Sequence, residues 1–130
     1  MPPHLQPPIL LPADEAELEF ISYQLGAKFD RGVLTVWFSA IEYGGIAVPR
    51  YYNVALKSQK SFIAPRGGAL VNDFRRIFTR PIGRLDRFPI QWLKDVRVLG
   101  KIGPVTKDAN QNEREEGTEY SVVRGLLKCL

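Results

Sequence analysis

Arginine recurs densely in the middle of this 130-residue sequence, where six arginines fall within the 22 residues from 66 to 87. A guanidinium group donates paired hydrogen bonds to phosphate and stacks on the faces of nucleobases. A series of this residue type is therefore typical of surfaces that bind phosphate groups. With the basic residues just upstream included, the cationic candidates are Arg50, Lys57, Lys60, Arg66, Arg75, Arg76, Arg80, Arg84 and Arg87.

Aromatic residues alternate with this positive charge, and Tyr51, Phe62 and Trp92 complete the candidate set. Proteins that bind single strands combine a positive groove with aromatic rings, and each base stacked on such a ring contributes about 1–3 kcal/mol. The alternation in IAVPRYYNV puts Tyr52 on the apolar side of a strand, so we expect Tyr51 to be the exposed ring. Trp92 suits a place in the core equally well.

The charge is unevenly distributed along the chain, although its net value is only +4. Residues 1–45 carry two basic and six acidic residues, residues 46–107 carry thirteen and three, and residues 108–130 carry three and five. A contiguous basic segment between two acidic ones favours a localised field that attracts anions. The alternative is a solvated surface on which about half of the candidate cations pair with the chain's own carboxylates.

Few residues of this sequence suit catalysis or metal binding. The single histidine, His4, lies in a proline-rich terminal segment, and the single cysteine, Cys129, is next to last. A histidine-based triad and the usual zinc sites need more such residues than this. Asp73, Asp86 and Asp95 lie among arginines and are expected to pair with them rather than to hold a metal. We therefore predict a non-enzymatic protein with no catalytic residues, no metal site and no cofactor.

The hydrophobic pattern predicts a mainly β domain with one short helix. Period-two alternation begins at Phe20 and places Ile21 and Tyr23 on the buried face, and two further strands follow over 33–42 and 46–56. Apolar residues at 70, 71, 74, 77 and 78 form the stripe of an amphipathic helix. Segments 94–106 and 118–127 complete the pattern. We predict a five-stranded, partly open barrel like the oligonucleotide-binding (OB) fold, with the helix between strands three and four.

The N-terminal segment sets the predicted boundary of this domain. Residues 1–13 hold five prolines and are expected to form an extended arm, outside a single domain of residues 14–130. The arm lacks the basic and apolar regions of a secretory signal, and the chain has no apolar run of about 18 residues that would cross a membrane. The lone cysteine fits a reducing compartment. We therefore expect a cytoplasmic protein without membrane contact, and the oligomeric state stays open.

The succession LTVWFSAIEYGGIAVPRYYNV, an amphipathic helix and WLKDVRVLGKIGPVT resembles phage- and plasmid-encoded single-stranded-DNA-binding proteins of the OB fold. In that pattern, a strand that ends in an acidic residue leads through a glycine turn into a strand that ends in an aromatic–Asn–aliphatic step. The matching residues here are Glu42, Gly44, Gly45, Tyr52, Asn53 and Val54. The resemblance spans residues 20–125 and implies binding of single-stranded DNA.

Charge, aromatic residues and this resemblance together predict a protein that binds single-stranded DNA or RNA and serves the replication or recombination of a mobile element. Affinity would come mainly from phosphate neutralisation and would depend steeply on salt. The alternative is a protein-interaction module, for example an inhibitor of a host defence complex, because arginine and aromatic residues also dominate protein interfaces. An accessory subunit of a larger replication enzyme is a third class.

Overall fold

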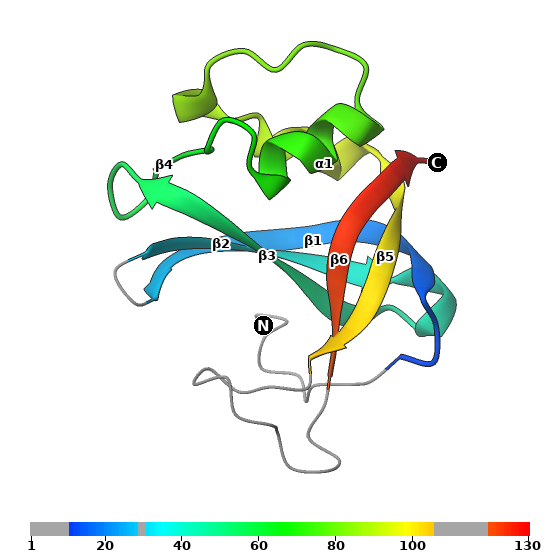
Figure 1. Ribbon diagram of the computed structural model, residues 1–130. Coiled ribbons are helices and arrows are strands. Elements are labelled where there is room, and N and C mark those ends of the chain that lie inside the picture. Colours follow the sequence, from blue (N-terminus) through cyan, green and yellow to red (C-terminus); the bar gives the residue numbers. More distant parts are fainter. Residues whose placement is uncertain (1–10, 29–30, 106–119) are drawn as a thin grey trace.

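Residues 11–28, 31–105 and 120–130 are described by the computed structural model, and they form one antiparallel sheet with one α-helix (Figure 1). The strands lie in the order β4-β3-β2-β1-β5-β6. The sheet curls, so that β3 also comes to lie beside β6. The elements are β1 (Glu15–Lys28), β2 (Arg31–Ala40), β3 (Ile46–Leu56), β4 (Phe62–Ile63), α1 (Ala69–Ile77), β5 (Arg97–Val105) and β6 (Tyr120–Cys129).

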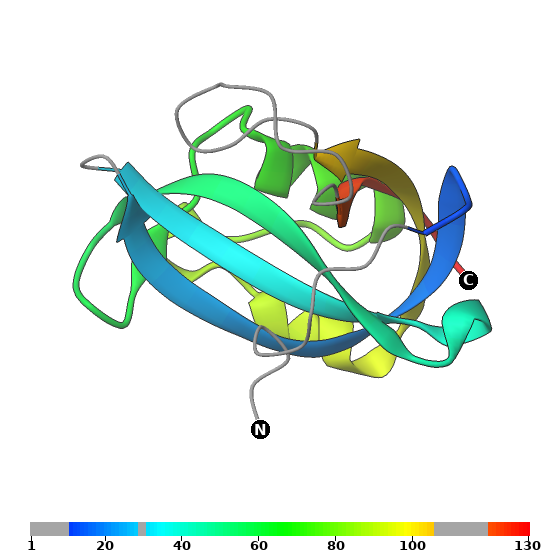
Figure 2. The same cartoon turned by 90° about the horizontal axis from the view of Figure 1, so that it is seen from below.

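Strands β2 and β3 follow the alternation that their sequences predict. Leu34 lies opposite Tyr52 across the ladder, and both side chains are buried. Thr35 lies opposite Tyr51 on the other face, because successive side chains of a strand point to opposite sides of the sheet. Figure 2 views the molecule from that outer side, where β1, β2 and β3 run side by side with α1 behind them. The inner face of the two strands forms much of the core.

Strand β1 begins at Glu15, five residues before the predicted start, and its alternation changes side at a bulge. Leu18 is buried, but the register with β2 shifts between Phe20 and Ser22. A bulge inserts one unpaired residue, so the residues on either side of it alternate out of phase. The bulge leaves Ile21 without an opposite residue on β2, and Ile21 is 41% exposed. Tyr23 lies opposite Val36 on the inner face but remains 43% exposed, so the expected burial of both residues is wrong.

Helix α1 packs on β6 and β3 and covers one end of the sheet. Leu70, Val71, Phe74 and Ile77 of its apolar stripe are buried as predicted, and Phe78, just after the helix, is half-buried. The ring of Phe74 packs against that of Phe88 with 4.6 Å between centroids. Asp73 departs from the amphipathic pattern because it is fully buried. Two short 3₁₀ helices, η3 (Leu85–Arg87) and η4 (Ile90–Asp95), follow α1 and add apolar side chains to the same core.

The prediction of a mainly β fold with one helix is confirmed, but the predicted number of strands is wrong. Phe62 and Ile63 form an additional strand, β4, by pairing with Leu56 and Ala55 at the end of β3. The sheet therefore has six strands, and α1 follows the fourth strand rather than the third. A two-residue strand carries no detectable period, which is why the polar segment 57–68 resembles a loop in sequence.

The chain just before β1 contributes to the core. Leu11 is buried, and its backbone N–H donates a 2.8 Å hydrogen bond to Oγ of Ser121 on β6. The backbone N–H of Ile102 on β5 donates a 2.7 Å bond to the carbonyl of Asp14. Residues 11–14 are thus fastened to β5 and β6, whereas residues 1–10 of the expected arm lie outside the described residues. In the described ranges, no helix combines the length and apolar character of a membrane span.

Candidate nucleic-acid interface

The predicted site is split between the two faces of the sheet, because Arg50 and Tyr51 are consecutive residues of β3. Arg50 lies opposite Val36 on the inner face, where its side chain is only 14% exposed. Tyr51 lies opposite Thr35 on the outer face and is 43% exposed. The two neighbours therefore do not share a surface, and of the two it is Tyr51 that faces solvent.

A buried carboxylate on α1 holds Arg50 inside the fold. Oδ2 of Asp73 accepts hydrogen bonds from the Tyr52 hydroxyl at 2.6 Å and from Nε of Arg50 at 3.2 Å. Nη1 of Arg76 lies 3.1 Å from Oδ1 and donates a 3.0 Å bond to the carbonyl of Leu126 on β6. Burial, followed by the charge of Asp73, raises the pKa of the Tyr52 hydroxyl well above its ordinary value. This network joins α1 to β3 and β6, so Arg50 and Arg76 first of all stabilise the fold.

A second carboxylate restrains two more of the predicted cations. Arg84 donates to both oxygens of Asp86, at 2.9 and 2.6 Å, and Nζ of Lys57 lies 3.4 Å from Oδ2. The hydrogen bond from Arg84 is the main cause that lowers the pKa of Asp86 to about 2, and Lys57 adds to it. Arg84 and Lys57 are exposed, so either cation can exchange this partner for another anion at small cost.

The remaining predicted cations have no carboxylate partner within the described part of the chain. Arg80 packs over aromatic rings, and the exposed others are Lys60, Arg66, Arg75 and Arg87. Residues 50–92 hold nine basic side chains and two acidic ones, Asp73 and Asp86, so the segment keeps a net charge of +7. Because each carboxylate is shared by two cations, internal pairing leaves most of the positive charge of this segment uncompensated.

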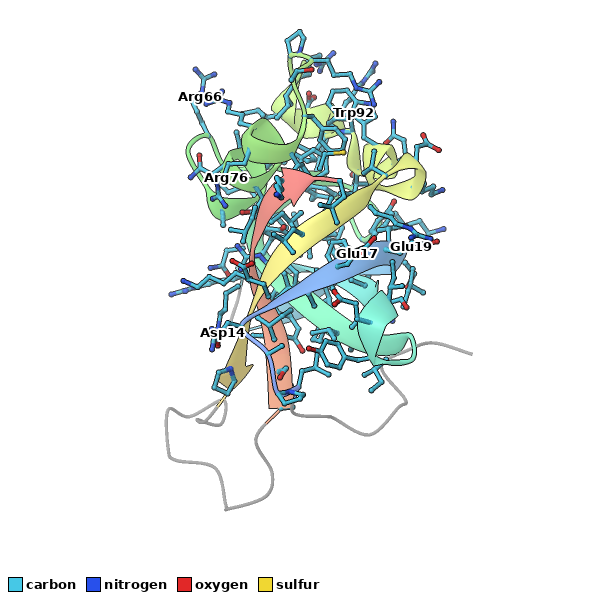
Figure 3. All side chains as sticks on the ribbon, turned by 90° about the vertical axis from the view of Figure 1, so that its right-hand side faces the viewer. Asp14, Glu17, Glu19, Arg66, Arg76 and Trp92 are labelled. Carbon is cyan, nitrogen blue, oxygen red and sulfur yellow. The ribbon has the colours of Figure 1, made fainter. Side chains whose placement is uncertain are left out.

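The positive and negative side chains are also separated in space. Figure 3 shows Arg66 and Arg76 around α1, and Glu17 and Glu19 on β1, away from that helix. These two glutamates pair with Arg97 of β5 at 3.5 Å each. Arg97 is thus engaged by the glutamates of β1. Around α1, Arg76 is held by Asp73, whereas Arg66 and Arg75 have no carboxylate partner in the described part of the chain and are available to an anionic ligand.

Two of the three predicted aromatic rings pack into the fold. Phe62 is only 8% exposed and packs among core rings, so it does not present a face for stacking, contrary to the sequence-based expectation. Trp92 packs edge-on against Phe78 with 5.3 Å between centroids, and the guanidinium of Arg80 lies 3.9 Å above the Trp92 ring. In Figure 3, Trp92 lies across the top of the molecule from Arg66. The Arg80–Trp92 pair is therefore separate from the surface around Arg66.

Tyr51 is the predicted aromatic residue whose ring is accessible. The prediction that Tyr51 is the exposed ring and Tyr52 the buried one is confirmed, since Tyr52 is only 1% exposed. Partial burial and a hydrogen bond with Tyr120 of β6 raise the pKa of the Tyr51 hydroxyl above its ordinary value. The Tyr51 side chain is therefore uncharged at neutral pH and is held between β3 and β6.

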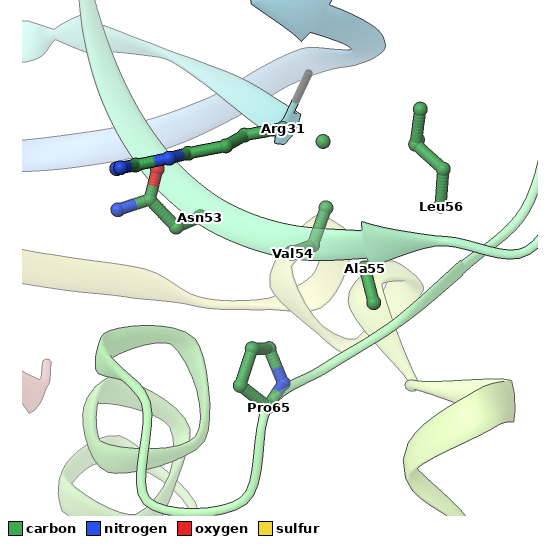
Figure 4. A pocket seen from close by; sticks show the side chains of 7 residues that line it. Arg31, Asn53, Val54, Ala55, Leu56 and Pro65 are labelled. Atoms are coloured by element: carbon green, nitrogen blue, oxygen red, sulfur yellow. The ribbon is translucent and has the colours of Figure 1, made fainter. Parts of the chain in front are cut away.

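A depression of about 510 Å³ at the end of β3 adds residues that were not among the predicted binding residues (Figure 4). Asn53 lies two residues after Tyr51 on the same outer face, and Arg31 begins β2. Both side chains line the depression, and Pro65 closes its other side, just before Arg66. Strand periodicity predicts that Asn53 shares the outer face with Tyr51. Arg31 resembles a turn residue in sequence, and it lies at the depression because β2 pairs with β3.

No three His, Cys, Asp or Glu side chains lie together as a metal site among residues 11–28, 31–105 and 120–130. Comparisons with protein-family models, with curated proteins and with solved structures give no match to this chain.

Proposed function

We propose that this protein binds single-stranded nucleic acid, DNA in the first place, along the outer side of β3 and the basic segment of residues 50–92. The observation that carries the proposal is the net charge of +7 on that segment, next to the accessible ring of Tyr51. Phosphate neutralisation would supply most of the affinity, and stacking would add a contribution that is independent of salt.

The connectivity of the sheet supports this proposal. Strand β1 pairs with both β2 and β5, β6 pairs with β5, and β3 lies beside β6. Apart from the two-residue β4, these pairings resemble those of a five-stranded OB-like barrel with a helix after its third long strand, and we include that fold in the proposal. Folds of that type bind oligonucleotides on the face of their second and third strands. Here those strands are β2 and β3, which carry Tyr51 and Asn53 on that face.

Single strands fit this surface better than duplexes do. In a duplex, the faces of the bases are stacked on one another, and a ring such as Tyr51 can contact them only after they separate. The binding is proposed without catalysis. Its setting, the replication or recombination of a mobile element, is proposed from the resemblance of the sequence alone.

Fluorescence-anisotropy titration with labelled single-stranded and double-stranded oligonucleotides, over a series of salt concentrations, tests the proposal. We expect tighter binding of the single strand. With about five phosphate contacts, a plot of log K against log salt should fall with a slope of roughly −3.5. Polyglutamate serves as a control polyanion without bases and should compete poorly. Equal competition by polyglutamate, or no binding of either oligonucleotide, would favour the protein-interaction alternative.

A further inference from the structure

We infer that the depression at the end of β3 is a subsite for one nucleotide of the bound strand, an inference that rests on the proposed function. Its lining residues are Arg31, Gly32, Asn53, Val54, Ala55, Leu56 and Pro65, and none of them is acidic. Its volume of about 510 Å³ falls within the range of about 300–1,000 Å³ that is common for small-ligand sites. One base with its sugar and phosphate fits such a volume.

The floor of the depression is apolar and open to solvent. Leu56 is 43% exposed, and Pro65 lies across from it. Gly32 makes this floor possible, because a Cβ there would lie 2.5 Å from the carbonyl oxygen of Val54 and 2.9 Å from Cγ of Leu56. Only glycine lets the two strands and Leu56 approach so closely. The flat side of a nucleobase can cover Leu56 and Pro65 and remove their apolar surface from water.

The rim supplies the two polar groups that a nucleotide needs. The side chains of Arg31 and Asn53 extend along β3 at the edge of the depression (Figure 4). Both residues are exposed, and neither side chain has a hydrogen-bond or ion-pair partner in the described part of the chain. The Asn53 amide offers donors and an acceptor to the edge of a base, and the Arg31 guanidinium offers a fork of donors to a phosphate.

The position of the depression makes it continuous with the proposed binding surface. Asn53 follows Tyr51 by two residues on the same face of β3, so one strand can stack on Tyr51 and place the next nucleotide in the depression. On the far side, Pro65 leads directly to Arg66, which is exposed. The strand would thus run from Tyr51 past Asn53 to Arg66, with its phosphates toward Arg31 and Arg66.

Titration of the ¹⁵N-labelled full chain with a mononucleotide tests the subsite directly. With dTMP or dAMP, we expect the amide signals of Gly32, Asn53 and Ala55 and the side-chain amide signal of Asn53 to shift together. The exposed side-chain amide of Gln91 on η4 is the matched control and should not shift. In the Asn53→Ala variant, the shifts at Gly32 and Ala55 should shrink, while the Gln91→Ala variant should respond as the wild type does.

Titrations with inorganic phosphate alone and with deoxyadenosine alone distinguish the contribution of the phosphate from that of the nucleoside. If phosphate alone reproduces the full pattern of shifts, the depression binds an anion and the nucleotide subsite is refuted. Absence of shifts at Gly32, Asn53 and Ala55, while oligonucleotides still bind in anisotropy, refutes the subsite but leaves the proposed function intact. Shifts there without any oligonucleotide binding refute the proposed function and, with it, the placement of a bound strand, because the depression would then bind free nucleotides only. If both measurements show binding, Asn53→Ala should weaken the binding of an oligonucleotide by about fivefold.

Discussion

The hydroxyl of Tyr52 donates a 2.6 Å hydrogen bond to Oδ2 of Asp73, and this bond joins β3 to α1 inside the protein. Both residues are almost fully buried, so the carboxylate depends on protein groups in place of water. Arg50 and Arg76 neutralise its charge from either side. Two of the arginines in the basic segment are therefore needed by the fold, and a test of ligand binding should leave them unchanged.

Loss of the Asp73 carboxylate should destabilise the protein strongly. Removing one partner of a buried pair costs about 3–5 kcal/mol, and we expect the Asp73→Asn variant to lie near the lower end because Arg76 is half-exposed. Tyr52→Phe should cost about 1.5–3 kcal/mol, the contribution of a hydrogen bond to a charged group. Urea unfolding monitored by circular dichroism measures both free energies. The control is Asp95→Asn on η4, which is exposed and should unfold like the wild type.

The two variants should also be coupled. Because the Tyr52 hydroxyl and the Asp73 carboxylate interact directly, the double variant should lose less free energy of unfolding than the sum of the single variants. Strict additivity would show that the 2.6 Å contact contributes nothing of its own.

Leu11 should matter for stability although it precedes the first strand. Its side chain is buried, and truncation of a buried leucine to alanine costs about 2–5 kcal/mol. We expect Leu11→Ala to lower the urea midpoint clearly. Leu130→Ala is the matched control, since Leu130 is 55% exposed and the same truncation there should change little. Equal midpoints for the two variants would show that residues 11–14 do not hold to β5 and β6 in solution.

The carboxyl of Asp86 should titrate well below the ordinary range of aspartate. Its hydrogen bonds from Arg84 and Lys57 favour the charged form and lower its pKa to about 2. A lowered pKa in the folded state stabilises the fold above the unfolded pKa of about 3.9, and this contribution is lost as the pH falls toward 2. NMR titration of the side-chain carboxyl measures the pKa. In the Arg84→Ala variant the pKa should rise toward the ordinary value, and an unchanged pKa would rule out the Arg84 pair as its cause.

The sequence was informative where one period ran without interruption, as in β2 and β3, where alternation separates Tyr52 from Tyr51. The sequence was misleading where the position of a polar residue depends on a contact with a distant segment of the chain. Asp73 fits the polar face of an amphipathic helix, and its burial is tolerable because Arg50 and Tyr52 approach it from β3 and Arg76 pairs with it on α1. Arg31 likewise joins Asn53 only through the register of two strands. Such partners are distant in sequence, so residue type and spacing along one segment do not reveal them.

Tyr51 should contribute to binding through its ring. Tyr51→Ala should weaken the binding of a single-stranded oligonucleotide by about 1–3 kcal/mol and leave the salt dependence unchanged, because a stacked base releases no counterion. Tyr51→Phe keeps the ring and loses only the hydroxyl that bonds to Tyr120, so it should bind as the wild type does. Anisotropy titration of the two variants makes the comparison. Equal loss in both variants would mean that the hydroxyl, rather than stacking, carries the effect.

The salt dependence of single-strand binding tests the central claim most directly. The Arg66→Ala/Arg75→Ala double variant removes two exposed cations that have no carboxylate partner in the described ranges, and it leaves the Asp73 network intact. Its control is Arg97→Ala/Lys101→Ala on β5, which removes the same charge from the side that carries Glu17 and Glu19.

For each protein, log K is measured against log salt by fluorescence anisotropy with a single-stranded oligonucleotide. Two lost phosphate contacts should reduce the slope of the Arg66→Ala/Arg75→Ala variant by about 1.4, whereas the slope of the control should equal that of the wild type. Equal slopes for the two double variants would contradict the proposed surface, and a wild-type slope near zero would contradict phosphate neutralisation as the main source of the affinity.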